Sequence, residues 1–131
     1  IPIFGWYLKK IGSISIKRDK VTKDNLGFFN DIKNVIHKTD RPLIIFPQGT
    51  RVKPEERPPF KKGAGRIYEE LKISCLPVVI NSGYVWPKKG PKISNRQITV
   101  SILPRIESGM DKNEFVKNLE EKIYTELDKI N

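Results

Sequence analysis

The chain has 131 residues, which is enough for one hydrophobic core and too few for two independent domains. Hydrophobic residues make up 37% and charged residues 31%, a balance that favours a folded globular domain and excludes a disordered chain. The net charge of +10 is uneven, since residues 1–110 hold 21 Lys and Arg against 9 Asp and Glu, so an anionic partner is expected: nucleic acid, anionic lipid or a phosphorylated metabolite.

The N-terminal third predicts one strand and one helix. Residues 1–11 mix aromatic and aliphatic side chains with two lysines, which suits either a membrane interface or ordinary packing against the body. Alternating isoleucines predict a half-buried strand over residues 13–18 that ends at Arg18. Apolar residues at helical spacing predict a helix over residues 22–37.

A short apolar, β-prone run over residues 42–46 predicts a buried strand. Pro47 cannot donate a ladder hydrogen bond and should end that strand. Residues 47–62 then predict a loop stiffened by four prolines and carrying five cations against two glutamates. Such a loop is usually solvated surface, but here it continues directly from the motif described below.

The remaining elements are expected at residues 63–71 (helix), 76–80 (buried strand), 97–103 (half-buried strand) and 111–130 (helix, capped by Asp111). Cys75, the only cysteine, excludes an internal disulfide and favours a reducing compartment, and we expect it to be a core residue and not a nucleophile. No stretch is long and apolar enough to span a bilayer. The alternation of strands and helices predicts a single α/β domain with a mainly parallel mixed sheet flanked by helices.

The most informative motif follows the 42–46 run and reads Phe46-Pro47-Gln48-Gly49-Thr50-Arg51. Gly49 permits a close approach that a Cβ would obstruct, and the Arg51 guanidinium suits bidentate capture of phosphate or carboxylate. Because ligands of α/β sheets gather beyond the carboxyl ends of strands, Arg18 is a candidate for the same anion site. A strand-terminating turn, with Arg51 either solvated or clamping the following loop, explains the same residues without a ligand.

Four blocks in order resemble those of the glycerolipid acyltransferases, the family of 1-acylglycerol-3-phosphate O-acyltransferases (lysophosphatidate acyltransferases). Residues 2–18 are similar to the family's second block, which ends in an Arg. The hexapeptide resembles its Phe-Pro-Glu-Gly-Thr-Arg block, and residues 60–64 resemble the Phe-Lys-x-Gly segment that follows. Residues 76–80 resemble the fourth block, an apolar strand with an early proline.

This resemblance covers essentially the whole chain and implies one acyltransferase domain over residues 1–131, without its N-terminal catalytic block. It implies transfer of a fatty acyl group from acyl-CoA or acyl carrier protein to 1-acyl-sn-glycerol-3-phosphate, which forms phosphatidate in phospholipid biosynthesis. It implies a lysophospholipid acceptor, a membrane surface as partner, no nucleic acid, no metal and no cofactor beyond the acyl donor. The implied location is the cytoplasmic face of the membrane, peripheral or anchored through an N-terminal part. The residues implied to bind the acceptor are Arg18, Phe46, Pro47, Gln48, Gly49, Thr50, Arg51 and Lys61.

Three departures from the family pattern bear on the chemistry. Gln48 replaces the family's Glu, and because either side chain can accept a hydrogen bond, restoring Glu is expected to be tolerated. Lys17 stands where an acidic residue usually precedes Arg18. The family's general base, a His followed after four residues by an Asp, is expected upstream of Ile1. His37, the only histidine, lies between the second and third blocks, so the chain alone is expected to be inactive.

Two other functions remain open. A non-catalytic basic module could bind anionic lipid or nucleic acid, although no common nucleic-acid-binding signature is present. A degenerate paralogue could bind lipid without having the base. Steep salt dependence would indicate nucleic acid, whereas dependence on acyl-chain length would indicate the lysophospholipid.

Overall fold

The computed structural model describes residues 6–7, 10, 25–39, 41–93 and 95–131, which divide into two compact units, Ile1–Ile44 and Ile45–Asn131. The first unit contains α2 (Asn25–Thr39), which confirms the helix expected over residues 22–37. Its last turn carries His37 and Lys38, and the Thr39 hydroxyl donates to the Val35 carbonyl at 2.7 Å. The strand expected over residues 13–18, with Arg18, lies outside the described residues.

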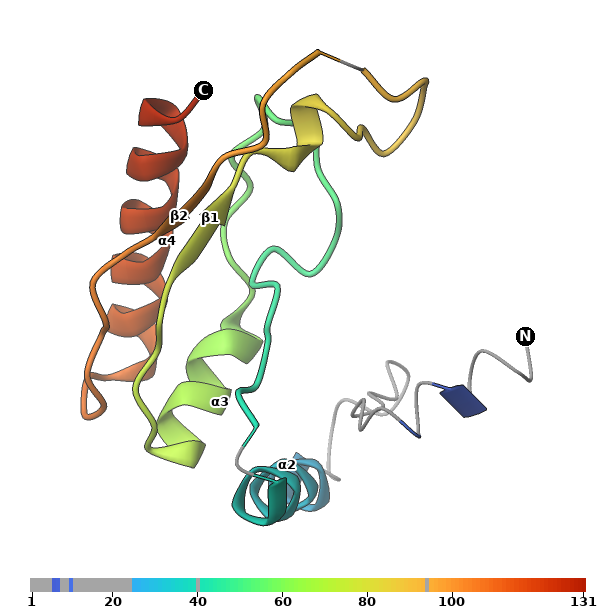
Figure 1. Cartoon of the computed structure of the whole chain (residues 1–131). Helices are drawn as coiled ribbons and strands as arrows, with labels where there is room; N and C mark the ends of the chain where they lie inside the picture. Colours follow the sequence, from blue (N-terminus) through green and yellow to red (C-terminus); the bar gives the residue numbers. More distant parts are fainter. Residues whose placement is uncertain (1–5, 8–9, 11–24, 40, 94) are drawn as a thin grey trace. The chain divides into compact units, whose positions relative to one another are not determined.

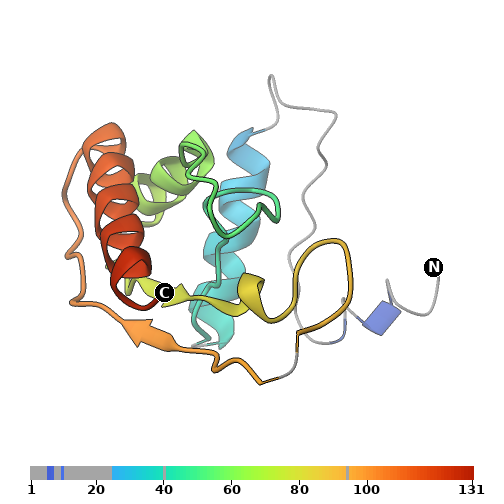
Figure 2. The same ribbon diagram turned by 90° about the horizontal axis from the view of Figure 1, so that it is seen from above.

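The second unit is built from two helices and a β-hairpin (Figure 1). Its elements are α3 (Lys62–Leu71), β1 (Val78–Ile80), the 3-10 turn η1 (Ser82–Tyr84), β2 (Val100–Ile102) and α4 (Lys112–Lys129). Helices α3 and α4 pack against each other, and α4 also contacts β1, so both helices lie on one side of the hairpin (Figures 1 and 2). None of the described helices is both long and apolar enough to cross a bilayer.

The described sheet consists of two antiparallel strands, with Val79 opposite Ser101 at the centre. Val79 is buried, whereas the side chains of the alternate face are exposed; they are Val78, Ile80, Val100 and Ile102. The mixed α/β character is confirmed, but the mainly parallel sheet is not confirmed among the described residues.

The strand expected over residues 42–46 is not formed. Ile44 and Phe46 have 76% and 80% of their surface exposed instead. A β-prone run becomes a strand only where a second strand pairs with its backbone groups, and β1 and β2 pair with each other instead. The prediction of a buried strand over residues 42–46 is therefore wrong, although the run is apolar.

The core of the second unit joins both helices to the segments around the hairpin. Its buried residues are Phe60, Tyr68, Ile106, Phe115 and Leu119. The Tyr68 and Phe115 rings stack with centroids 3.8 Å apart, and the Tyr68 hydroxyl donates to the Glu107 carbonyl at 2.5 Å. Cys75 is half-buried and packs against this core, as expected, and burial raises the pKa of its thiol.

Two features fix how α3 and α4 meet. Asp111 caps α4 as expected, because its carboxylate accepts hydrogen bonds from the backbone N–H groups of Asn113 (2.8 Å) and Glu114 (3.2 Å), and these bonds lower the pKa of Asp111. Gly65 of α3 lies directly against the first turn of α4. A Cβ at Gly65 would stand 2.4 Å from the Lys112 carbonyl oxygen, so only glycine permits this approach.

Candidate functional site

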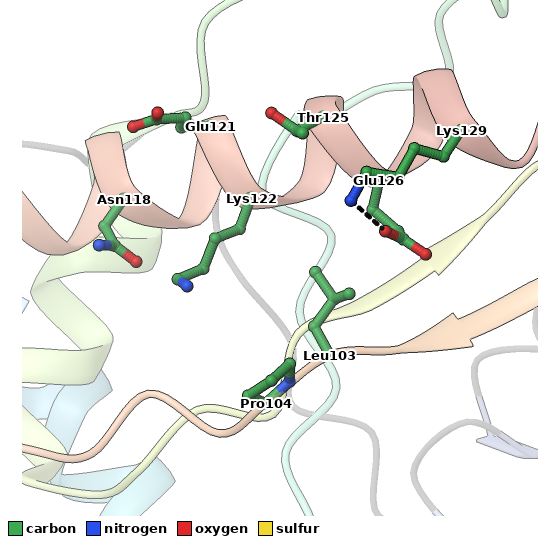
Figure 3. Close-up of a pocket in the computed structure, with 8 residues that line it drawn as sticks. All are labelled: Leu103, Pro104, Asn118, Glu121, Lys122, Thr125, Glu126 and Lys129. Carbon is green, nitrogen blue, oxygen red and sulfur yellow. Dashed lines mark ion pairs between the residues drawn. The ribbon is translucent and has the colours of Figure 1, made fainter.

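A pocket of about 400 Å³ lies between α4 and the segment that follows β2 (Figure 3). Leu103 and Pro104 line one side of it and Lys122 points toward them from α4. The Asn118 Oδ1 atom is buried and has no hydrogen-bond partner among the described residues, and the Ser101 hydroxyl donates to Glu126 at 2.7 Å. None of the residues predicted to bind substrate lines this pocket, so the candidate site lies elsewhere.

The hexapeptide forms a tight turn. The Gly49 N–H donates to the Phe46 carbonyl at 3.0 Å, with Pro47 at the second position of the turn. Gly49 has a φ of +72°, a left-handed conformation that a side chain would strain. Proline at the second position and glycine at the fourth are typical of a type I β-turn. The expected turn is therefore confirmed, and it presents Thr50 and Arg51 to solvent.

The chain returns to this turn at Lys61 and closes a loop over residues 47–61. The Lys61 N–H donates to the Pro47 carbonyl at 2.8 Å. A Cβ at Gly49 would lie 3.2 Å from Lys61 Cγ, so the aliphatic part of Lys61 runs directly alongside the turn. The hexapeptide and residues 60–64 thus contact each other in the fold, as an anion site shared by Arg51 and Lys61 requires.

Both cations are available to a ligand. The side chains of Arg51 and Lys61 are exposed, and neither forms a hydrogen bond or ion pair with any residue in the described part of the chain. Phe46 is also exposed, and Pro47 and Gln48 are half-buried. Arg18 lies outside the described residues, so the structure brings together the predicted site residues over 46–51 and at 61.

A row of polar residues on α4 holds the loop in place. Glu120, Tyr124 and Asp128 recur at four-residue spacing and therefore share one side of the helix. Glu120 accepts from the Phe60 N–H at 2.6 Å, and Asp128 accepts from the Arg57 guanidinium at 2.6 Å. The Tyr124 hydroxyl donates to the Pro58 carbonyl at 2.5 Å. This row, called the anchor row below, fixes the C-terminal half of the loop.

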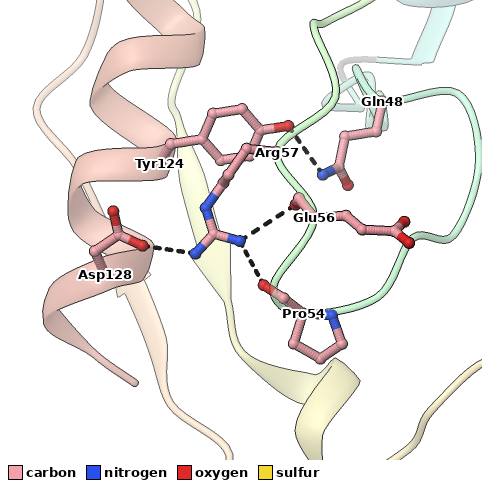
Figure 4. A network of polar contacts seen from close by, with 6 residues as sticks. All are labelled: Gln48, Pro54, Glu56, Arg57, Tyr124 and Asp128. Atoms are coloured by element: carbon pink, nitrogen blue, oxygen red, sulfur yellow. Dashed lines mark hydrogen bonds and ion pairs between the residues drawn. The ribbon is translucent and has the colours of Figure 1, made fainter.

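Arg57 clamps the loop from its own side (Figure 4). Its guanidinium donates to the carbonyls of Pro54 and Glu56, the latter at 3.2 Å, and its centre lies 5.4 Å from the Tyr124 ring centroid. The sequence had left open whether Arg51 clamps this loop. Since Arg57 does so, Arg51 remains free for an anion.

Gln48 connects the turn to the anchor row. Its amide nitrogen donates to the Tyr124 hydroxyl oxygen at 3.3 Å (Figure 4). The Tyr124 hydroxyl donates its own proton to the Pro58 carbonyl, so toward Gln48 it is an acceptor, and burial raises its pKa. The Gln48 amide is thus a donor toward α4, and its carbonyl oxygen is the atom left to accept a hydrogen bond from a substrate hydroxyl.

The sequence analysis missed the anchor row and Arg57. The signal was present, because Glu120, Tyr124 and Asp128 follow an i, i+4, i+8 pattern beside the apolar stripe of the C-terminal helix. A solvated helix face shows the same pattern, so the spacing alone does not indicate a contact with a loop sixty or more residues earlier in the chain.

Comparison with known proteins yields one family model and several curated relatives. The model described as "Acyltransferase" matches residues 1–81, which include the hexapeptide and Lys61. A 1-acyl-sn-glycerol-3-phosphate acyltransferase of Helicobacter pylori strain J99 is 32% identical over 130 residues, 96% of this chain and 53% of the relative. The Saccharomyces cerevisiae protein of the same name is 34% identical over 94 residues, 69% of this chain and 31% of the relative.

A third relative of that name, from Pseudomonas aeruginosa, is 30% identical over 92 residues, 69% of this chain and 35% of the relative. The chain thus spans from about a quarter to about half of the length of the curated relatives it matches. No solved structure gives a significant match.

Proposed function

The chain belongs to the acyltransferase family, and on this premise we propose that it provides the acceptor-phosphate site of a 1-acyl-sn-glycerol-3-phosphate acyltransferase. The observation that carries the proposal is the closed loop over residues 47–61. It holds two exposed cations, Arg51 and Lys61, beside a left-handed glycine, and it leaves both without a partner among the described residues.

Each residue of the loop has a proposed task. The Arg51 guanidinium would grip two phosphate oxygens through parallel hydrogen bonds, and Lys61 would add a second positive charge. The Gln48 carbonyl oxygen would accept a hydrogen bond from the glycerol, and Thr50 and the turn at Gly49 would shape the pocket around it. Arg18 would complete the phosphate site, as the resemblance implies.

The reaction moves an acyl group from the sulfur of a thioester to the oxygen of a hydroxyl group. The free hydroxyl of the acceptor attacks the thioester carbonyl of acyl-CoA or acyl carrier protein, the new ester C–O bond forms, and the thiol leaves with the proton taken from the hydroxyl. An alcohol needs a positioned base for this step, and we propose that the base is supplied outside residues 1–131. Residues of this chain would hold the acceptor within reach of it, which is itself a large part of catalysis.

Three further proposals accompany this function. We place the complete protein at the cytoplasmic face of a membrane, because its acceptor and product are lipids and its lone cysteine suits a reducing compartment. We expect no metal or cofactor besides the acyl donor and no nucleic-acid partner. The mainly parallel acyltransferase sheet stays a prediction for the complete domain.

Calorimetric binding of a short-chain lysophosphatidate to the 131-residue chain tests the phosphate site. Arg51→Lys should weaken binding about tenfold and Arg51→Ala up to about a hundredfold, since losing a charged hydrogen bond costs about 1.5–3 kcal/mol. Arg105→Ala removes the same charge from a residue that contacts Ser74 and is the matched control. Unchanged affinity in both Arg51 variants, with unchanged melting temperatures, would refute the site.

A non-catalytic lipid-binding module is the second candidate, favoured by the exposed cations alone. The complete protein distinguishes the two, because only an enzyme forms phosphatidate from lysophosphatidate and acyl-CoA.

A further inference from the structure

The loop that joins β1 to β2 is long and lies away from α3 (Figure 1). Hydrogen bonds hold its base. At the base, the buried Asn81 donates to the Ile130 carbonyl at 3.0 Å and accepts from the Thr99 N–H at 2.8 Å. Farther out, the Ile93 N–H donates to the Val85 carbonyl at 2.9 Å. Residues 84–93 and 95–97, called the hairpin loop below, are therefore joined to a hydrogen-bonded stem at the C-terminal end of α4.

The hairpin loop is strongly basic and lacks any opposing charge. Its cations, Lys88, Lys89, Lys92 and Arg96, are all exposed. The sequence contains no Asp or Glu from residue 71 to residue 106, although charged residues make up 31% of the chain. None of these four cations forms an ion pair within the described part of the chain. An anionic surface would supply the missing countercharge.

Apolar side chains stand among these cations. Trp86 is 61% exposed and Ile93 45% exposed, so the loop presents apolar surface among its cations. The Lys92 ammonium lies 3.8 Å from the Trp86 ring centroid, and the Arg96 guanidinium lies 5.7 Å from the Tyr84 centroid. Each of these two aromatic rings thus has a cation over one face.

We propose that the hairpin loop is the contact of this protein with an anionic lipid bilayer. Tryptophan and tyrosine favour the headgroup level of a membrane, where the apolar ring is buried and the polar edge stays wet. Lysine and arginine beside them are attracted by anionic headgroups. Single-stranded nucleic acid needs open aromatic faces for stacking, whereas Lys92 and Arg96 already cover one face of each ring. The exposed Ile93 adds apolar surface that acyl chains can bury.

The base of the hairpin loop contacts the loop that carries the candidate phosphate site. A Cβ at Gly83 would lie 3.1 Å from Pro54 Cγ, so the two loops touch at these residues. A bilayer held by the hairpin loop therefore lies next to the segment that follows the hexapeptide. The choice of lipid as the occupant rests on the proposed function, because the proposed acceptor is itself a membrane lipid.

The experiment uses Trp86 as its own reporter. The chain has two tryptophans, so Trp6→Phe leaves Trp86 as the only one. Phosphatidylcholine vesicles containing increasing phosphatidylglycerol are added to the 131-residue Trp6→Phe chain. We expect a blue shift of Trp86 emission, and quenching by bromine-labelled acyl chains, that increase with the phosphatidylglycerol fraction.

Charge variants then locate the contact. Lys88→Gln with Lys89→Gln should weaken vesicle binding roughly 25-fold, at about fivefold for each cation near an anionic surface. Lys117→Gln with Lys122→Gln removes the same charge from exposed positions on α4 and should leave binding within about twofold. Circular dichroism melts confirm that all variants are folded. Equal losses in the two pairs, or absence of a Trp86 shift, would overturn the proposal.

Two further readouts separate this inference from its rivals. Binding of a random 20-nucleotide single-stranded DNA that is tighter than vesicle binding, and that is lost in the Lys88 and Lys89 variant, would overturn the bilayer as occupant. If vesicles fail to bind while short-chain lysophosphatidate still binds, the hairpin-loop proposal falls and the phosphate site stands. Vesicle binding without lysophosphatidate binding supports the hairpin loop and refutes the proposed function.

Discussion

Replacing Gln48 by Glu tests the contact between the hexapeptide turn and α4. The sequence alone suggests that the exchange is tolerated, because the family has Glu and both side chains can accept a hydrogen bond. In the structure, however, the amide nitrogen of Gln48 donates to Tyr124, whose own proton is already donated to the Pro58 carbonyl. An ionised Glu would place a carboxylate oxygen against a hydroxyl oxygen, so we expect the opposite result.

The size of the effect follows from the bonds involved. The hydrogen bond is lost and an acceptor is left facing an acceptor in a half-buried site, which together cost about 1–3 kcal/mol. If Tyr124 turns its proton toward the new carboxylate, the Pro58 carbonyl loses its partner instead. We therefore expect a loss of about 1–3 kcal/mol in the free energy of unfolding at pH 7, or roughly 4 °C in melting temperature for each kcal/mol.

Urea unfolding of four chains measures this: the original, Gln48→Glu, Tyr124→Phe and the double variant. The penalty of Gln48→Glu should shrink in the Tyr124→Phe background, where no hydroxyl oxygen faces the carboxylate. It should also shrink near pH 4.3, the ordinary pKa of Glu, because a protonated carboxyl regains a donor. A Gln48→Glu chain as stable as the original, or a penalty unaffected by Tyr124→Phe, would refute this account.

Three further predictions concern stability. Gly65→Ala should destabilise the fold by about 1–3 kcal/mol, because its Cβ would overlap the Lys112 carbonyl oxygen. Its control is Gly63→Ala, which has open space around its Cβ and should be neutral or stabilising. Similar melting temperatures of the two variants would contradict the close contact between α3 and α4. Arg57→Ala should lower the free energy of unfolding by about 1–3 kcal/mol, because its hydrogen bonds to two loop carbonyls are lost. Asp128→Asn should lower it by less than about 1 kcal/mol, because the Asp128 carboxylate is 65% exposed. Equal losses in chemical unfolding would argue against the clamp by Arg57. Asp111→Asn keeps the cap without its titration. The pKa of Asp111 is lowered in the folded state, so its stabilising effect is present above the unfolded-state pKa and is lost as the pH falls through the folded-state pKa. The original chain should therefore lose stability on acidification more steeply than the variant. Parallel profiles of stability against pH would contradict the role of the Asp111 carboxylate as a cap.

Local patterns were sufficient to predict the helices of the described part. The 3.6-residue spacing and the Asp111 cap predicted α4 nearly to the residue, and the helix predicted over residues 63–71 agrees with α3 to within one residue. Both depend on interactions within a few residues of one another. The run at 42–46 failed because strand formation depends on a partner that periodicity does not identify.

The candidate site divides in the same way. The turn at Gly49 was predicted because its cause is local, namely a proline followed two residues later by a glycine. The return of Lys61 to that turn was expected only through the resemblance. The role of Tyr124 was not predicted, since its partners Gln48 and Pro58 are 76 and 66 residues away in the sequence.

The anchor row has a consequence for how such proteins change over time. The family model ends at residue 81, yet the hexapeptide loop is held by a helix that begins at Lys112. Positions 48 and 124, and positions 57 and 128, should therefore vary as pairs among close relatives. Where Glu stands at position 48, we expect the residue equivalent to Tyr124 to be a donor, or its hydroxyl to be missing. A fragment that ends at residue 81 would keep the residues of the hexapeptide but lose α4, the helix that holds their conformation.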